Sequence, residues 1–80
     1  MAPEATIHQT LDCTGLYCPY PVIKTRQVID TMEVGQVLEL IADDPAAEED
    51  MLRWAKRTGQ ELLEMRKDGG RLYFLFRKVR

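Results

Sequence analysis

One segment of this chain reads as a helix with both ends marked, lying between two strand-like runs. In residues 43–59, DDPAAEEDMLRWAKRTG, Asp44 can cap the N-terminus, Pro45 suits the first helical position, and acidic residues crowd the first turn. Gly59 is a typical stop just past the C-terminus. A single apolar stripe predicts that this helix lies on a sheet, and the stripe comprises Ala47, Met51, Trp54, Ala55 and Thr58.

Strand and helix patterns alternate through the rest of the chain. Residues 6–12, TIHQTLD, predict a short half-buried strand, and residues 37–42, VLELIA, predict a more apolar one. Between them, the stretch from Pro19 to near Met32 has helical spacing, with Val22, Thr25, Val28 and Ile29 on one stripe. The runs ELLEMRK and RLYFLFRKV flank Asp68-Gly69-Gly70, which indicates a hairpin because glycine adopts positive φ without steric cost.

The order β-α-β-α-β-β constrains the architecture. Right-handed crossovers that do not reverse direction place both helices on the same face of a sheet. We therefore expect an α+β two-layer sandwich, with a mixed four-stranded sheet and two helices on one face. Residues 1–80 are expected to form a single domain, with 1–5 as a flexible tail.

The last strand is apolar on both faces, with Leu72, Phe74 and Phe76 alternating with Tyr73, Leu75 and, further on, Val79. One of these two sets faces away from the helices. It is either partly covered by the N-terminal tail or long side chains, or it forms a surface for a partner or a second copy.

Composition limits the function classes. The chain has 80 residues, a net charge of −2 and a charged fraction of 30%, so it lacks the basic character expected of a nucleic-acid-binding domain. No apolar run approaches the ~18 residues of a membrane span, and the N-terminus lacks a secretion signal, so we expect a cytoplasmic protein. Two cysteines and one histidine favour neither a disulfide framework nor a zinc site, and we expect no metal and no cofactor.

The segment GLYCPYPVIKTR, residues 15–26, surrounds one thiol with prolines at the start of the first predicted helix. If Cys18 is the N-cap, Pro19 and Pro21 occupy positions whose N–H groups would lack a helical partner in any case. The amides of Tyr20 and Val22 then remain as donors near the sulfur. Together with the helix dipole they would lower the thiol pKa and suit a nucleophile or an anionic persulfide.

Two other interpretations stay open from the residues alone. Cys18 could be an inert buried thiol that only fills space at a helix start. Cys13 is expected to be a loosely packed loop thiol, with a resolving or second sulfur site as the alternative. The sequence contains none of the motifs that are typical of acyl-transfer enzymes or of metallohydrolases.

The sequence resembles the TusA/SirA family of small sulfur-carrier proteins over residues 10–80. The resemblance rests on the CPxP motif at 18–21, on Asp12, Gly15 and Leu16 before it, on Arg26 after it, and on ADDP at 42–45. It implies a carrier whose Cys18 accepts persulfide sulfur from a cysteine desulfurase or rhodanese-type donor and passes it to an acceptor protein. Relatives serve tRNA thiolation, molybdenum cofactor pathways or sulfur oxidation.

This chain departs from the family pattern at two positions. Tyr20 stands where many relatives have an acidic residue, and Gln60 stands where relatives often have His. Asp12 and Arg26 are expected to hold the loop and helix together. We expect a carrier more than a turnover enzyme, a monomer or weak dimer, with no direct contact to nucleic acid or membrane. A thiol redox or regulatory switch and a pure interaction module are the alternatives.

Overall fold

The computed structural model describes residues 6–80 and has the order of elements that the sequence predicts. The strands are β1 (Gln9–Cys13), β2 (Val37–Ala42), β3 (Glu61–Asp68) and β4 (Arg71–Arg77). The helices are α1 (Tyr20–Thr31) and α2 (Ala46–Thr58). The expected tail at 1–5 lies outside the described residues.

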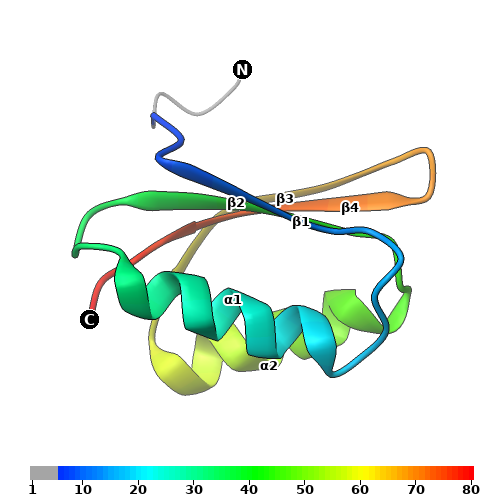
Figure 1. Cartoon of the computed structure of the whole chain (residues 1–80), viewed down its shortest axis with the longest axis horizontal. Coiled ribbons are helices and arrows are strands. Elements are labelled where there is room, and N and C mark those ends of the chain that lie inside the picture. The colour runs from blue at the N-terminus through cyan, green and yellow to red at the C-terminus, as the bar shows by residue number, and fades with distance from the viewer. Residues whose placement is uncertain (1–5) are drawn as a thin grey trace.

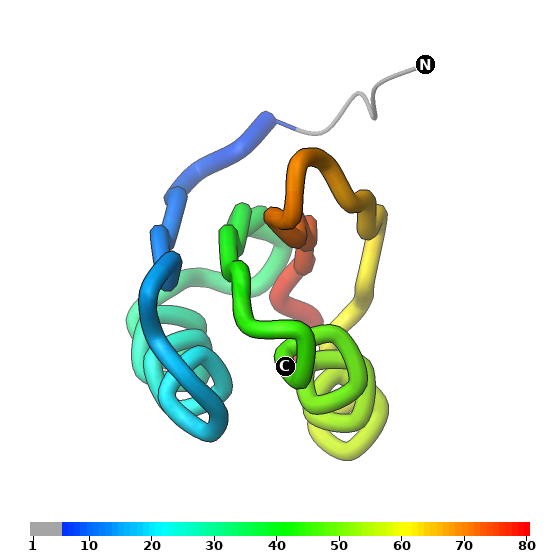
Figure 2. The backbone as a smooth tube through the Cα atoms, turned by 90° about the vertical axis from the view of Figure 1, so that its right-hand side faces the viewer, coloured from blue at the N-terminus to red at the C-terminus, as the bar shows by residue number. Residues whose placement is uncertain are grey.

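The four strands form one mixed sheet in the order β1-β2-β4-β3. β1 and β2 are parallel, whereas β4 is antiparallel to both β2 and β3. Both helices lie on the same side of the sheet, as Figures 1 and 2 show from two directions. The predicted two-layer architecture is therefore confirmed.

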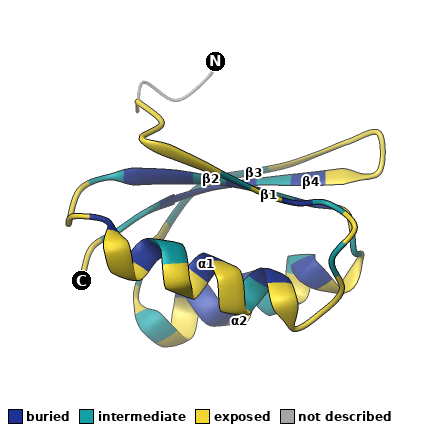
Figure 3. Ribbon diagram, in the orientation of Figure 1, coloured by how far each residue is buried: buried dark blue, intermediate teal, exposed yellow. Residues whose placement is uncertain are grey.

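The core lies between the helices and the sheet. In Figure 3 the buried stretches of α1 and α2 face the strands and the exposed stretches face away. Trp54 of α2 packs edge-on against Phe76 of β4, with ring centroids 5.4 Å apart, and Phe76 stacks on Phe74. The predicted stripe of α2 is buried at Ala47, Met51, Trp54 and Ala55 and half-buried at Thr58.

The face of β4 that points away from the helices is partly covered by a long side chain. The guanidinium carbon of Arg66 lies 4.3 Å from the ring centroid of Tyr73, a cation–π contact that shields part of this face. Leu75 on the same parity is only 8% exposed, whereas Val79, beyond the strand, is 39% exposed.

The predicted C-terminal end of α2 is confirmed, whereas its N-cap residue is Pro45, one residue later than predicted. Asp44 Oδ1 accepts the Ala46 N–H at 3.1 Å, and the Asp44 carbonyl accepts the Ala47 N–H at 2.9 Å. Gly59 ends the helix with φ of 79°. Asp44 thus satisfies two of the donors that a helix leaves free at its start.

β1 differs from its predicted range, residues 6–12. It begins at Gln9 and extends through Cys13, because the five residues from Gln9 to Cys13 pair in register with β2, Cys13 lying opposite Ala42. The periodicity of Ile7 and Leu11 gave the correct element but placed its C-terminal end one residue early. Cys13 was expected in a loop and is instead the last residue of the strand, with no exposed surface.

Candidate functional site

The loop between β1 and α1 is held at the sheet edge by carboxylates from the turn between β2 and α2. Gly15 donates its N–H to Asp43 Oδ1 at 2.9 Å, and Cys18 donates its N–H to Asp44 Oδ2 at 2.8 Å. Because β1 and β2 are parallel neighbours, their C-terminal ends meet at the same edge, which brings these two segments together. The topology of the sheet therefore positions Cys18 beside the start of α2.

The first part of the same loop is closed locally by Asp12. Its Oδ1 accepts both the N–H and the hydroxyl of Thr14, at 2.9 and 2.7 Å. These bonds lower the pKa of Asp12, the bond from the Thr14 backbone being the larger cause. Gly15 has φ of 82°, a conformation that favours glycine. Asp12 thus closes the loop through Thr14, and these bonds do not join the loop to the helix as the sequence prediction had it.

The start of α1 differs from the prediction by one residue. Pro19, and not Cys18, is the N-cap residue, and α1 begins at Tyr20. The Tyr20 N–H donates to the Tyr17 carbonyl at 2.9 Å, and the Ile23 N–H donates to the Pro19 carbonyl at 3.1 Å. The Tyr20 amide is therefore engaged and is not a free donor for the Cys18 sulfur. The Tyr20 N–H is used in the hydrogen bond that closes the turn at residues 17–20. The spacing of the prolines in the sequence did not indicate this turn.

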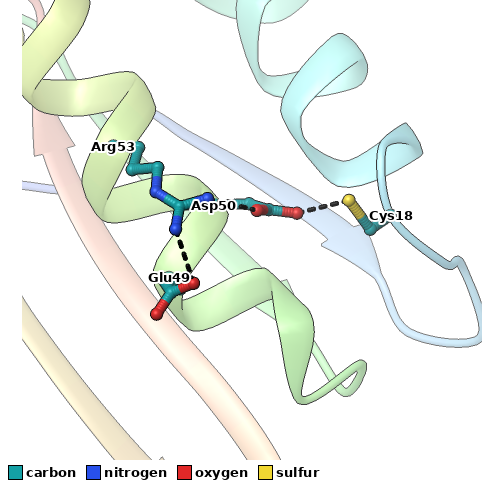
Figure 4. A network of polar contacts seen from close by, with 4 residues as sticks. All are labelled: Cys18, Glu49, Asp50 and Arg53. Atoms are coloured by element: carbon teal, nitrogen blue, oxygen red, sulfur yellow. Dashed lines mark hydrogen bonds and ion pairs between the residues drawn. The ribbon is translucent and has the colours of Figure 1, made fainter.

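The Cys18 thiol donates its hydrogen bond to a side chain of α2. Its Sγ contacts Asp50 Oδ2, and Figure 4 shows the thiol and carboxylate pointing toward each other across the gap between the helices. The other oxygen of Asp50, Oδ1, lies 3.8 Å from Arg53. Arg53 is bound more closely to Glu49, at 2.7 Å. Asp50 is thus only weakly paired with a cation.

This arrangement reverses the expected electrostatics of the thiol. The hydrogen bond to Asp50 raises the pKa of Cys18, and partial desolvation and the charges of Asp50 and Asp44 act in the same direction. A carboxylate beside a thiol disfavours the thiolate because both would be negative. The prediction of a lowered pKa was based on helix α1 alone, and it is wrong for the unloaded protein.

A shallow hollow of about 230 Å³ lies beside Cys18. It is lined by Cys18, Pro19 and Val22 from the α1 side and by Asp50, Arg53 and Arg57 from α2. Cys18 is exposed, so a reagent or a partner protein can reach it. The hollow therefore combines one nucleophile, one carboxylate and two guanidinium groups.

A second groove continues from this hollow between the two helices. The two share Val22 and Arg57, and the groove is further lined by Ile23, Arg26, Gln27, Asp30 and Trp54. Arg26 is exposed here, and within residues 6–80 no hydrogen bond or ion pair joins it to Asp12. The expectation that Arg26 holds the loop to the helix is therefore not met; it lies on the groove surface.

The remaining predicted site residues divide by exposure. Tyr20, the first residue of α1, is 57% exposed, whereas Pro21, the next residue of the helix, is buried. Cys13 lies in the core, where burial raises the pKa of its thiol. Among the described residues no cluster of three or more His, Cys, Asp or Glu side chains could hold a metal ion, and no helix there is long and apolar enough to cross a membrane.

Three carboxylates of the site were not identified as such from the sequence. Asp43 and Asp44 were read only as the entry to α2, although the ADDP motif that contains them also anchors the cysteine loop. Asp50 carried no local signal, since it is 32 residues from Cys18 and sits among other acids of the same helix. Only the packing of α2 beside α1 reveals its role.

A two-layer α+β fold with one exposed cysteine at a helix start defines a class of small thiol proteins, and comparison with known proteins specifies the family. The family model described as sulfurtransferase TusA matches residues 9–78. The chain is 42% identical over 74 residues to the sulfur carrier protein TusA of Allochromatium vinosum, covering 92% of this chain and 97% of that protein. It therefore belongs to the TusA family of sulfur carrier proteins.

One further sequence relative agrees with this assignment, and one solved structure has the same fold. A putative sulfur carrier protein of Archaeoglobus fulgidus is 46% identical over 71 residues, covering 88% of this chain and 92% of that protein. The crystal structure of a SirA-like protein from Desulfitobacterium hafniense superposes with a TM-score of 0.77, covering 90% of this chain and 99% of that one. At 24% sequence identity, this last comparison establishes the shared fold.

Proposed function

We propose that this protein carries sulfur as a persulfide on Cys18 and passes it to an acceptor protein in a relay. The observation that carries the proposal is the contrast between the two thiols: Cys18 is exposed beside a hollow, whereas Cys13 has no exposed surface. The CPxP motif that contains Cys18 is one of the elements on which the resemblance to the family rests. A thiol that must meet two different partners has to be accessible, and Cys18 is.

The transfer step needs no external oxidant. The Cys18 thiolate attacks the outer sulfur of a donor persulfide, and the new S–S bond forms as the donor's own S–S bond breaks. The donor's inner sulfur leaves as a thiolate and takes up the proton that Cys18 released. Donation to the acceptor repeats the same exchange with Cys18 as the leaving thiol.

The partners that we propose are those that the resemblance to the family implies. The donor is a protein that generates a cysteine persulfide, of the cysteine desulfurase or rhodanese type, and the acceptor is a further relay protein in tRNA thiolation, molybdenum cofactor synthesis or sulfur oxidation. We assign the carrier to the cytoplasm, as a single domain acting as a monomer or weak dimer, with no metal, cofactor or nucleic acid. It is a carrier that is consumed and regenerated stoichiometrically, more than a turnover enzyme.

Intact-mass measurement tests the proposal. The wild type, Cys18→Ser and Cys13→Ala are each incubated with a cysteine desulfurase and free cysteine. We expect one added sulfur mass, removable by reductant, on the wild type and on Cys13→Ala, and none on Cys18→Ser. Loading that persists in Cys18→Ser would overturn the assignment. Loss of loading in both variants would favour the two-thiol redox alternative, which requires Cys13 to leave the core.

A further inference from the structure

The hollow beside Cys18 is lined by charged side chains of both signs. These side chains interact differently with the Cys18 thiol and with a persulfide on Cys18. Asp50 accepts the hydrogen bond of the thiol, and its charge is only weakly balanced because Arg53 is held 3.8 Å away by its closer contact with Glu49. Arg57 lines the same hollow, and within residues 6–80 it makes no ion pair. One carboxylate is therefore bound to the sulfur, and one guanidinium is free.

We propose that Asp50 holds the unloaded Cys18 as a hydrogen-bonded, unreactive thiol and that Arg57 receives the outer sulfur of the loaded persulfide. The second half of this inference rests on the proposed persulfide carriage, whereas the first half concerns the reduced protein alone. Both halves assign roles to residues of α2 that lie outside the CPxP motif.

The first half follows from the charge of Asp50. A thiol can donate to a carboxylate, but a thiolate beside the same carboxylate meets a like charge. The charge of Asp44 also raises the pKa of Cys18, and Arg53 and Arg57 are the cations that line the same hollow. Because Asp50 is the group in direct contact, it dominates, and the thiol stays protonated near neutral pH.

The role of Arg57 follows from the change in charge when Cys18 is loaded with sulfur. The outer sulfur of a persulfide is more acidic than a thiol and is anionic near neutral pH, so it no longer donates a hydrogen bond to Asp50. It is repelled by that carboxylate and extends one bond further into the hollow. The cation there without an ion-pair partner is Arg57, whose guanidinium offers several donors to an anion. The empty and loaded forms therefore contact different residues of α2.

This arrangement has a functional consequence. A carrier whose empty thiol is protonated resists alkylation and oxidation by small molecules while it diffuses between partners. A donor protein that places a cation against Asp50 would release the thiolate at the moment of transfer. Reactivity would then depend on docking.

The first test uses the reduced protein without any sulfur donor. The rate of Cys18 alkylation by iodoacetamide is measured against pH for the wild type, Asp50→Asn and Asp30→Asn, an exposed aspartate of α1 outside the hollow. We expect Asp50→Asn to move the midpoint to lower pH and to speed alkylation at neutral pH about two- to fivefold, the range for a partly exposed charge interaction. Asp30→Asn should stay with the wild type.

An unchanged midpoint in Asp50→Asn, or an equal shift in Asp30→Asn, would overturn the role of Asp50. Asp50→Glu serves as the conservative variant: it restores a carboxylate, and its midpoint should return toward that of the wild type. Far-ultraviolet circular dichroism of each variant checks that the fold is intact, so that a shifted midpoint in Asp50→Asn with a near wild-type midpoint in Asp50→Glu reports the carboxylate and not a folding defect.

The second test loads Cys18 with limiting sodium tetrasulfide, from which the thiolate takes one sulfur and leaves trisulfide. The loaded fraction is measured by intact mass for the wild type, Arg57→Gln and Lys56→Gln, which removes a charge from the neighbouring exposed position of α2. We expect Arg57→Gln to lower the ratio of loaded to unloaded protein about two- to fivefold and Lys56→Gln to leave it unchanged. Equal loading in all three would overturn the role of Arg57.

The two tests fail independently. If tetrasulfide does not load Cys18 in the wild type, the role of Arg57 is overturned, whereas the proposed persulfide carriage is decided by loading from the cysteine desulfurase. The alkylation profiles still decide the role of Asp50, because they involve the thiol only.

Discussion

The backbone N–H of Cys18 donates to Asp44 Oδ2 at 2.8 Å, across 26 residues of sequence. The same side chain caps α2 through its other oxygen, which accepts the Ala46 N–H. One carboxylate therefore fastens the cysteine loop to the helix that carries Asp50 and Arg57. The geometry of the site and the stability of α2 depend on the same residue.

Replacing Asp44 by Ala should lower the free energy of unfolding by about 1–3 kcal/mol, since it removes a helix cap and leaves the Cys18 amide without its acceptor. Urea denaturation measures this. Asp30→Asn, which removes an exposed carboxylate from α1, is the control and should change stability by less than about 0.5 kcal/mol. A loss in Asp44→Ala no larger than in this control would show that the two hydrogen bonds contribute little.

The ion pair between Glu49 and Arg53 should affect the pKa of the Cys18 thiol indirectly, through Asp50. In Glu49→Gln, Arg53 loses its partner at 2.7 Å and is free to approach Asp50, so the charge beside Cys18 is better balanced and its pKa should fall. In Arg53→Gln that balance is removed, and the pKa should rise. The midpoint of Cys18 alkylation should therefore move to lower pH in the first variant and to higher pH in the second.

These shifts should be smaller than that of Asp50→Asn, because neither side chain contacts the sulfur. High salt should reduce them, since Glu49 and Arg53 are largely exposed. If the alkylation midpoint moves in the same direction in Glu49→Gln and Arg53→Gln, then Arg53 does not act on the Cys18 thiol by balancing the charge of Asp50.

The parts of the structure that local patterns encode were predictable. Asp44, Pro45 and Gly59 bound α2 through cap and dihedral preferences that act within a few residues, and residues 37–42 form a strand with the predicted bounds. The crossover rule then gave the two layers. Each of these inferences depends either on interactions between residues close in sequence or on the right-handedness of β-α-β crossovers.

The environment of the thiol was not predictable in the same way. Its pKa depends on Asp50, which belongs to another helix, and the direction of the shift is decided by which side chain of α2 faces Cys18. The start of α1 differed because the turn at residues 17–20 engages the Tyr20 amide, a contact that competes with the expected cap. Tertiary contacts determine both outcomes.

A buried hydroxyl offers a test of packing in α1. Thr25 is fully buried, and its Oγ1 has no hydrogen-bond partner among the described residues. Thr25→Val keeps the shape and replaces an unpaired polar atom with a methyl group, so it should raise the free energy of unfolding by about 1 kcal/mol. Thr25→Ala, which leaves a small cavity, should not stabilise the protein. Urea denaturation of both variants checks this, and a destabilised Thr25→Val would show that the hydroxyl has a partner in solution.

Cys13 should be chemically silent in the folded protein. It has no exposed surface, and burial raises the pKa of its thiol above the ordinary 9.0, with Lys24 opposing this and Asp12 reinforcing it. Iodoacetamide near neutral pH should therefore add one label to the native chain, on Cys18, and two labels in denaturant. Two labels on the native chain at comparable rates would show that the end of β1 opens readily.

The raised pKa of Cys13 also predicts how its contribution to stability depends on pH. Folding favours the neutral thiol, so this contribution is fully present below the unfolded-state pKa near 9.0 and is lost as pH rises through the higher folded-state value. Cys13→Ala lacks the titrating group and should be less stable than the wild type by about 1 kcal/mol near neutral pH. That difference should shrink as the pH rises above 9.0. Urea midpoints of both proteins across the alkaline range measure it, and a gap that stays constant or widens as the pH rises would contradict a raised pKa for Cys13 in the folded protein.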